Sequence, residues 1–271
     1  MLSLNIFFKI TVFPLIILFY SCLLLAHEVV IQSTTSTRDS GLYEHLLPKY
    51  PLYDNISIKV IAVGTGQAIL NSKNCDGGIL IVHDERREQL FIAEGFGSKR
   101  YPLMFNDYVI NGPKKDKAKI VGSKSSEEVF TKIYNKKSKF ISRSDSSGTH
   151  AMEIKIWNNS KLNPIDYSGS WYLETGQGMG QSLNIAIATD AYILSDRSTW
   201  LKFQNKQNHK ILYQNKLELK NQYGMILVNT NRCNNIDKEA TYSLYNWLTS
   251  KDAQDLINGY LINNTQVYFS N

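Results

Sequence analysis

VVIQSTTSTRDSGL, residues 29–42, is the stretch that decides the fold. Its first four residues predict a short strand, and Asp39, Ser40 and Gly41 mark the start of a helix. Five of the seven residues at 31–37 are Ser or Thr. Asp39 or Ser40 alone would suffice as a plain helix cap, whereas five hydroxyls with nearby backbone N–H groups suit a dehydrated anion. The stretch therefore predicts a strand-to-helix unit that ends in an anion site.

Short apolar runs alternate with longer helical stretches along the rest of the chain. The predicted strands are residues 29–32, 56–63, 78–83, 101–110, 140–142, 187–194 and 224–228. The predicted helices are residues 41–50, 66–71, 121–136, 149–157, 179–188 and 237–248. Strands separated by helices indicate an α/β protein in which mainly parallel sheets are flanked by helices.

Two strand-like segments, residues 105–110 and 222–228, are candidates for carrying the chain between two lobes. In that arrangement lobe 1 comprises residues 27–107 plus 224–271, and lobe 2 comprises residues 108–223. The two segments would act as hinge strands, with a ligand held in the cleft between the lobes. The alternative is an ordinary strand that ends in a turn at Gly112 and Pro113.

The N-terminus carries an apolar run at residues 5–26, followed at once by polar residues. This pattern predicts a signal peptide at residues 1–26 that is removed after Ala26. A membrane anchor is the alternative, because the run is nearly long enough to span a bilayer. Lipid attachment at Cys22 is less consistent with the sequence, because Phe-Tyr-Ser before it is a poor lipobox and three leucines follow.

The formal net charge is +6, and much of the excess lies in Lys-rich, loop-like stretches at residues 114–119, 132–139 and 202–216. No aromatic residues are interleaved to stack on bases, so these stretches indicate a solvated surface rather than a nucleic-acid site. Cys75 and Cys233 show neither Cys-x-x-Cys spacing nor a nearby histidine pair, which argues against a metal site. Export permits a disulfide between them, but the sequence leaves their proximity open.

A second junction of the same kind is VGTGQA, residues 63–68. Its two glycines would let the backbone approach a ligand closely around Thr65. A lone Gly-x-Gly is equally compatible with a tight turn. It also lacks the third glycine and the downstream acid of a dinucleotide site.

The third junction is ISRSDSSGTH, residues 141–150. The guanidinium fork of Arg143 matches the spacing of two oxygens on a tetrahedral anion, and Ser147 and Thr149 would donate from a helix start. The alternative is a surface loop in which Asp145 caps the helix and pairs with Arg143.

A nucleophilic enzyme is the rival class, because Ser147 lies close to His150 in the sequence. Neighbouring side chains on a helix face different directions, and the chain has no Gly-x-Ser-x-Gly elbow.

His83, at the end of a predicted strand, is expected to be structural or exposed. Asp76, Asp84 and Glu85 lie on an expected loop and show no metal-site spacing with histidine. We therefore expect no enzymatic activity.

Seven motifs in their order along the chain resemble the tungstate-binding proteins of bacterial ABC transporters, which have the type II periplasmic-binding-protein fold. The motifs are TTSTRDSGL at 34–42, AVGTGQA at 62–68, FNDYVINGP at 105–113, SR with SSGTH at 142–150, WY at 171–172, GQGMG at 176–180 and AYILSDR at 191–197. The resemblance covers nearly all of the chain after residue 26.

The resemblance implies a two-lobed periplasmic protein, without a cofactor or metal, that binds tungstate in its cleft and docks as a monomer on a membrane permease. The residues implied to bind the anion are Ser33, Thr34, Thr65, Arg143, Ser147 and Thr149. The chain departs from the family at residues 74–78 and in the charged stretch 84–87. Both departures are expected to lie outside the pocket.

The choice of anion depends on only part of the pattern. Phosphate-binding proteins share the Arg-x-Asp-x-Ser-Gly-Thr pattern of residues 143–149, whereas the first motif and residues 176–180 favour tungstate. Molybdate has almost the same shape and charge and stays open. A carboxylate of Asp145 facing the pocket would favour phosphate, which carries a proton that the carboxylate can accept, and one turned away would favour tungstate or molybdate.

Overall fold

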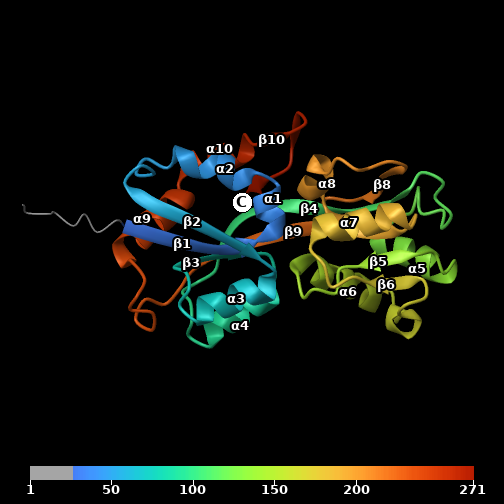
Figure 1. The fold of residues 1–271 in the computed structure, drawn as a ribbon, viewed down its shortest axis with the longest axis horizontal. Helices are drawn as coiled ribbons and strands as arrows, with labels where there is room; N and C mark the ends of the chain where they lie inside the picture. The colour runs from blue at the N-terminus through green and yellow to red at the C-terminus, as the bar shows by residue number, and fades with distance from the viewer. Residues whose placement is uncertain (1–26) are drawn as a thin grey trace, which may run out of the picture.

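The computed structural model describes residues 27–271, so the predicted signal peptide lies outside the described residues. It has two lobes joined by two long strands, β4 (Tyr101–Pro113) and β9 (Lys220–Leu227), which cross the middle of the molecule (Figure 1). Within this part of the chain, no helix has the length and apolar character needed to span a bilayer.

The first lobe is built from segments before β4 and after β9. Its elements are β1 (His27–Thr34), α1 (Thr35–Asp39), α2 (Leu42–Leu46), the 3₁₀ turn η1 (Leu47–Lys49), β2 (Ile56–Val63), α3 (Thr65–Lys73), β3 (Ile79–Val82), α4 (Glu85–Ala93), α9 (Lys238–Leu248), α10 (Lys251–Asn258), β10 (Leu261–Ile262), β11 (Thr265–Gln266) and β12 (Phe269–Ser270).

The second lobe lies between β4 and β9 in the chain. Its elements are α5 (Ser126–Asn135), β5 (Phe140–Ser142), α6 (Gly148–Asn159), the 3₁₀ turn η2 (Pro164–Tyr167), β6 (Tyr172–Glu174), α7 (Met179–Ala188), β7 (Tyr192–Asp196), α8 (Arg197–Lys202) and β8 (His209–Gln214).

One sheet runs through both lobes in the order β2-β1-β3-β9-β4-β7-β5-β6, and β8 and β12 also pair with β4. The strands at its two ends are parallel: β1 pairs with β2 and β3, and β5 pairs with β6 and β7. The central strands β9 and β4 are antiparallel to their neighbours. The predicted α/β fold, with a mainly parallel sheet in each lobe, is confirmed.

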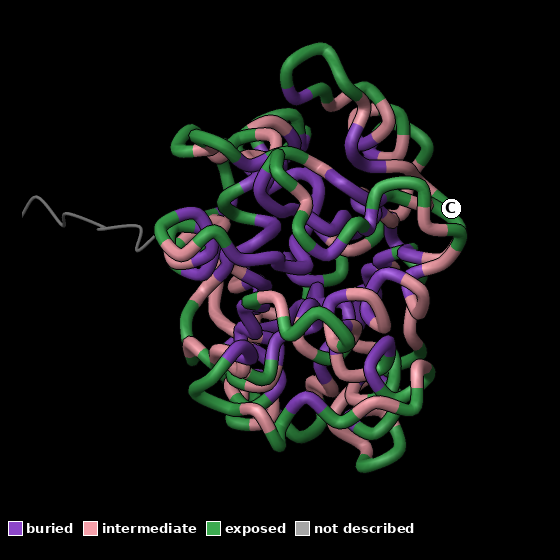
Figure 2. Tube along the Cα trace, turned by 90° about the vertical axis from the view of Figure 1, so that its right-hand side faces the viewer, coloured by how far each residue is buried: buried purple, intermediate pink, exposed green. Residues whose placement is uncertain are grey.

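Alternate residues of β3 contribute to different cores, because successive side chains point to opposite faces of a sheet. In β3, Ile79 and Ile81 pack with α2, α9 and α10, whereas Leu80 and Val82 pack with α3 and α4. Figure 1 shows these two groups of helices on opposite sides of the sheet. In Figure 2 the buried stretches run through the interior and the exposed ones lie outside.

The second lobe repeats this arrangement with its own two cores. Phe140 packs with the aromatic residues of α5 and α6, including Trp157. The next residue, Ile141, packs with α7 and with Trp200 of α8. Each β5 side chain therefore helps to fix one layer of helices against the sheet, and the end of β5 is held rigidly.

A buried polar network lies where β4, β9 and the end of β7 meet. Asp196 accepts hydrogen bonds from the side-chain amides of Asn106 (2.7 Å) and Asn221 (3.2 Å). Burial raises the pKa of Asp196. Beside it, the guanidinium of Arg197 donates two bonds to Asp107, at 2.7 and 2.6 Å. These bonds tie the crossing strands to the first turn of α8.

The structure differs from the sequence-based prediction at several boundaries. The apolar run expected as a strand at 187–194 is divided, because α7 ends at Ala188 and β7 begins at Tyr192 after a turn with positive φ at Asp190. Residues 202–216, expected as a loop, contain β8. Asp84 and Glu85, expected on a loop, are the N-cap and the first residue of α4, where the Asp84 carboxylate accepts from the Arg87 N–H.

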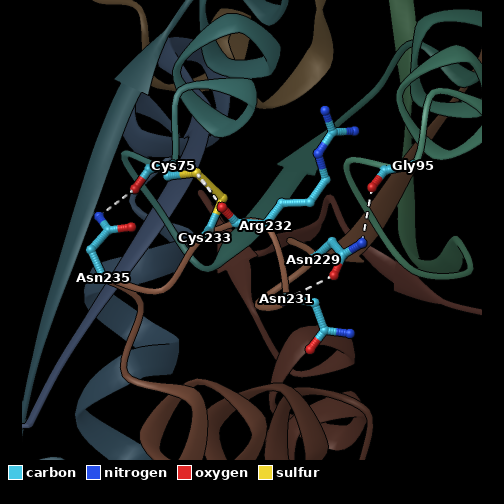
Figure 3. Close-up of a disulfide and its surroundings, with 7 residues drawn as sticks. All are labelled: Cys75, Gly95, Asn229, Asn231, Arg232, Cys233 and Asn235. Carbon is cyan, nitrogen blue, oxygen red and sulfur yellow. Dashed lines mark hydrogen bonds between the residues drawn. A yellow bond between two sulfur atoms is a disulfide. The ribbon is translucent and has the colours of Figure 1, made fainter.

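Cys75 and Cys233 form a disulfide, which answers the question left open by the sequence (Figure 3). Cys75 follows α3 and Cys233 follows β9, and their Cα atoms are 5.3 Å apart. The Asn235 side chain donates to the Cys75 carbonyl at 2.9 Å. The disulfide therefore joins the early and late segments of the first lobe.

Candidate anion-binding site

A cavity of about 560 Å³ lies where the two lobes face each other. We call it the cleft. It is formed by the ends of β1, β2 and β5 and by the loop before α7, because the carboxyl ends of parallel strands open at the edge of a sheet. Its lining residues are Thr35, Gly64, Gly66, Gln67, Leu70, Arg87, Arg143, Asp145, Ser146, Gly176 and Gly178. All three predicted junctions and the motif at 176–180 therefore meet at one place.

Arg143 is the central cationic group of the cleft. It is only 3% exposed, and it follows directly after β5. Its Nη1 donates to the Thr149 hydroxyl at 3.3 Å, and its Nη2 bonds to the Asp145 carboxylate. Its Nε is buried without a hydrogen-bond partner among the described residues. An anion in the cleft would therefore meet a guanidinium that is fixed in place and not fully satisfied.

Thr65 is the first residue of α3 and lies between two glycines that line the cleft. Its side chain is fully buried, and its hydroxyl has no partner within the described part of the protein. An unpaired buried hydroxyl is unfavourable, whereas a ligand oxygen would satisfy it. The geometry is therefore consistent with the predicted binding role of Thr65.

The hydroxyl cluster at the end of β1 is divided between two roles. Thr34, the N-cap of α1, contacts the Thr37 hydroxyl at 2.9 Å, and Thr35 beside it lines the cleft. The Ser33 hydroxyl instead donates to the Ile81 carbonyl at 3.0 Å and lies 2.5 Å from the Tyr43 hydroxyl. These contacts explain Ser33 as part of the first lobe's interior, and a direct role in binding stays a prediction.

The start of α6 lies next to the cleft in the second lobe, and Ser147 and Gly148 line an adjacent cavity of about 780 Å³ and not the cleft itself. The Ser147 hydroxyl caps the helix by accepting from the His150 N–H at 3.2 Å, and it keeps its own proton for donation. Gly148 packs directly on His83, where an added Cβ would lie 2.2 Å from the ring Nδ1. Only glycine fits there, so the helix start is held tightly against the first lobe. The positive end of the helix favours a nearby anion.

Asp145 forms an ion pair with Arg143, as the surface-loop interpretation expected. It also lines the cleft. One of its oxygens bonds to Arg143, and the other accepts from the Ser147 N–H at 3.1 Å. Arg143 itself is buried, whereas Ser144 and Asp145 are half-buried and Ser146 is exposed. The Asp145 carboxylate lies in the wall of the cleft, where it could accept the proton of a bound phosphate. Both of its oxygens, however, already accept hydrogen bonds from Arg143 and Ser147. The position of Asp145 therefore does not select the anion by itself.

His83 is a structural residue of the site, as expected. Its Nδ1 lies 2.9 Å from the Tyr108 hydroxyl. Burial, with a smaller contribution from the charge of Arg143, lowers the pKa of His83 to about 4, so the ring is neutral at pH 7. The Ser147 hydroxyl bonds to the backbone of His150, and among the described residues no bond joins it to an imidazole. Nor do three potential metal-ligating side chains come together within residues 27–271.

Arg87 is the site residue that the sequence-based reasoning missed. Residues 84–87 were expected to lie outside the pocket, which is wrong for Arg87, because α4 begins at Glu85 and carries this side chain to the cleft. Residues 75–78 do lie elsewhere, in the wall of a separate cavity of about 870 Å³. The helical spacing of charges and apolar residues after Asp84 was the signal for α4, but it did not indicate where Arg87 would lie.

The comparisons agree with this geometry. The model of the PBP superfamily domain matches residues 26–252. The tungstate-binding protein TupA of Peptoclostridium acidaminophilum is 38% identical over 235 residues, which cover 86% of this chain and 81% of that protein.

Two solved structures are similar over nearly their whole length. The tungstate ABC transporter structure from Geobacter sulfurreducens is 37% identical with a TM-score of 0.79, covering 86% of this chain and 98% of that one. The tungstate-binding protein TupA from Desulfovibrio alaskensis G20 is 34% identical with a TM-score of 0.77, covering 91% and 99%. The chain therefore belongs to the periplasmic-binding-protein superfamily and, within it, to the family of the tungstate-binding protein TupA.

Proposed function

We propose that this protein captures tungstate in the cleft and delivers it to the membrane permease of an ABC transporter. The observation that carries the proposal is the buried guanidinium of Arg143, whose Nε has no hydrogen-bond partner within residues 27–271. It shares the cleft with the two glycines that flank Thr65, whose hydroxyl also lacks a partner in this part of the chain. The names of the relatives give the anion.

The site acts by binding and not by catalysis. Arg143 supplies charge and a planar fork, while Thr65, Thr149 and the Ser147 hydroxyl supply neutral donors. Charge-assisted hydrogen bonds are roughly twice as strong as neutral ones, so Arg143 dominates the affinity. Thr34 and Ser33 complete the predicted set from the first lobe.

We propose that the lobes divide at residues 107/108 and 223/224 and that β4 and β9 serve as hinges. The change of core supports this division, since Met104 packs in the first lobe and Tyr108 in the second. Closure would bring the donors of the two lobes together around the dianion, and opening would release it to the permease.

We propose that the mature protein begins at residue 27 and works as a periplasmic monomer. The disulfide supports this location, because disulfides persist in oxidising compartments. The apolar run at 5–26 supports export through a signal peptide.

Two other anions remain as alternatives of the same class. Molybdate shares the shape and charge of tungstate. Phosphate is kept as an alternative because Asp145 lies in the wall of the cleft, although both of its oxygens already accept hydrogen bonds from the protein. Protonated phosphate could donate to this carboxylate, whereas tungstate carries no proton near neutral pH.

The test is calorimetry of residues 27–271 with tungstate, molybdate, sulfate and phosphate in parallel. Arg143→Ala should weaken tungstate binding by about 2 to 4 kcal/mol, because it leaves a buried dianion underpaired. Lys59→Ala, which removes one charge from an exposed position, is the matched control and should change little. Tight binding of phosphate alone would overturn the choice of tungstate, and wild-type affinity of Arg143→Ala would remove Arg143 from the site.

A further inference from the structure

Arg87 reaches from the first lobe to the second. Its Nε donates to the Asp84 carboxylate at 2.7 Å, which anchors the guanidinium on α4. Its Nη2 donates to the backbone carbonyl of Ser146 at 2.6 Å, across the cleft, in the loop between β5 and α6. The guanidinium of Arg87 therefore connects Asp84 in the first lobe to the loop that contains Ser146 in the second lobe.

The loop that receives this bond has an unfavourable backbone conformation. Ser144 has φ 45° and Ser146 has φ 57°, both in the left-handed region that non-glycine residues avoid. Such conformations persist only where surrounding contacts enforce them. The loop lies between Arg143 and Ser147, so its shape decides where the guanidinium of Arg143 and the start of α6 are placed.

The second junction of the cleft also contacts this guanidinium. A Cβ on Gly66 would lie 3.0 Å from Arg87 Nη1 and 3.9 Å from the Ser146 Cβ. Arg87 is thus packed between the start of α3 and the loop before α6. The side chain is 30% exposed, so it closes the edge of the cleft and keeps contact with solvent.

We propose that Arg87 is an interlobe latch: a positioning residue that holds the Ser146 loop in its binding shape and slows release of the anion. The proposal rests on the proposed function for the anion, but the contact with Ser146 can be tested without any ligand. Because Asp84 neutralises much of the charge of Arg87, the latch acts mainly through the bond to Ser146 and only weakly by attracting anions.

The first measurement compares tungstate affinity and release rate in wild type, Arg87→Ala and Arg87→Lys. Loss of one charge-assisted bond predicts roughly 10-fold to 100-fold faster release, with little change in association rate. Lysine keeps the charge but lacks the fork that reaches Asp84 and Ser146 together, so it should release as fast as alanine. Arg86→Ala removes a neighbouring exposed arginine and is the control.

The second measurement is hydrogen exchange of residues 143–150 without anion, with the thermal midpoint recorded alongside. Arg87→Ala should exchange faster in this segment than Arg86→Ala, at an equal thermal midpoint. If the wild type binds no tungstate, the proposed function fails and the exchange data still decide the latch. Wild-type release from Arg87→Lys, or equal exchange in Arg87→Ala and Arg86→Ala, would overturn the latch.

Discussion

The disulfide gives a prediction whose size follows from its position in the chain. Cys75 and Cys233 are separated by 158 residues, a loop that contains the whole second lobe. In the chain-entropy model, closing a loop of this length destabilises the unfolded state by about 5 kcal/mol at 25 °C. The stabilisation measured for disulfides is typically about 2 to 4 kcal/mol. Removing this disulfide should therefore lower the free energy of unfolding by about 2 to 5 kcal/mol.

The variant should leave the folded state otherwise intact. Cys75 lies near solvent and takes Ser, whereas Cys233 is 2% exposed and takes Ala, which avoids burying a new hydroxyl. The assay is denaturant unfolding of Cys75→Ser/Cys233→Ala and of the wild type with and without a reductant. Reduced wild type and the double variant should unfold at similar, lower denaturant concentrations.

Binding provides the control for this prediction. Cys75 lines the separate cavity and not the cleft, so tungstate affinity should be unchanged when the protein is folded. A double variant as stable as the oxidised wild type would refute the entropic reasoning. A loss of affinity without a loss of stability would show that the disulfide acts on the site itself.

Two further predictions concern buried groups around α6. Gly148→Ala places a Cβ 2.2 Å from His83 Nδ1, and this overpacking should cost about 1 to 3 kcal/mol of stability in denaturant unfolding and weaken tungstate binding in calorimetry. Burial raises the pKa of Glu153 to about 7, so the folded state binds this proton more tightly than the unfolded state. Stability should therefore fall as pH rises from about 4.5 to 7. Glu153→Gln, which keeps an acceptor for Trp157 and Tyr172, should show a flatter pH profile, and an unchanged profile would contradict the assignment.

The sequence predicted the parts of the fold that local pattern determines. The Ser/Thr cluster after β1, the Gly-Thr-Gly before α3 and the Arg143 segment after β5 were found separately, and the fold brings them to one cleft. β1 and β2 are parallel, so their carboxyl ends lie side by side, whereas β5 runs in the opposite direction in the second lobe and its carboxyl end faces theirs across the cleft. Their shared strand-to-helix layout predicted a candidate anion site at each junction, and the resemblance to the family predicted that the junctions share one cleft.

Other features depend on tertiary contacts that no local pattern encodes. Ser33 and Thr65 were both predicted to bind the anion, yet the Ser33 hydroxyl is satisfied inside the lobe and the Thr65 hydroxyl has no partner among the described residues. Arg87 was expected to lie outside the pocket, but α4 carries it to the cleft. The pairing of Cys75 with Cys233 required segments from opposite ends of the chain to meet.

The position of β9 has a consequence for the order in which the chain can fold during synthesis. This strand lies between β3 and β4 in the sheet, although residues 220–227 follow both of them by more than a hundred positions. During synthesis the sheet of the first lobe therefore lacks a central strand until nearly the whole chain has emerged. The core of the first lobe, which includes Tyr223, Met225 and Leu227 of β9, is therefore completed only after the second lobe has been synthesised.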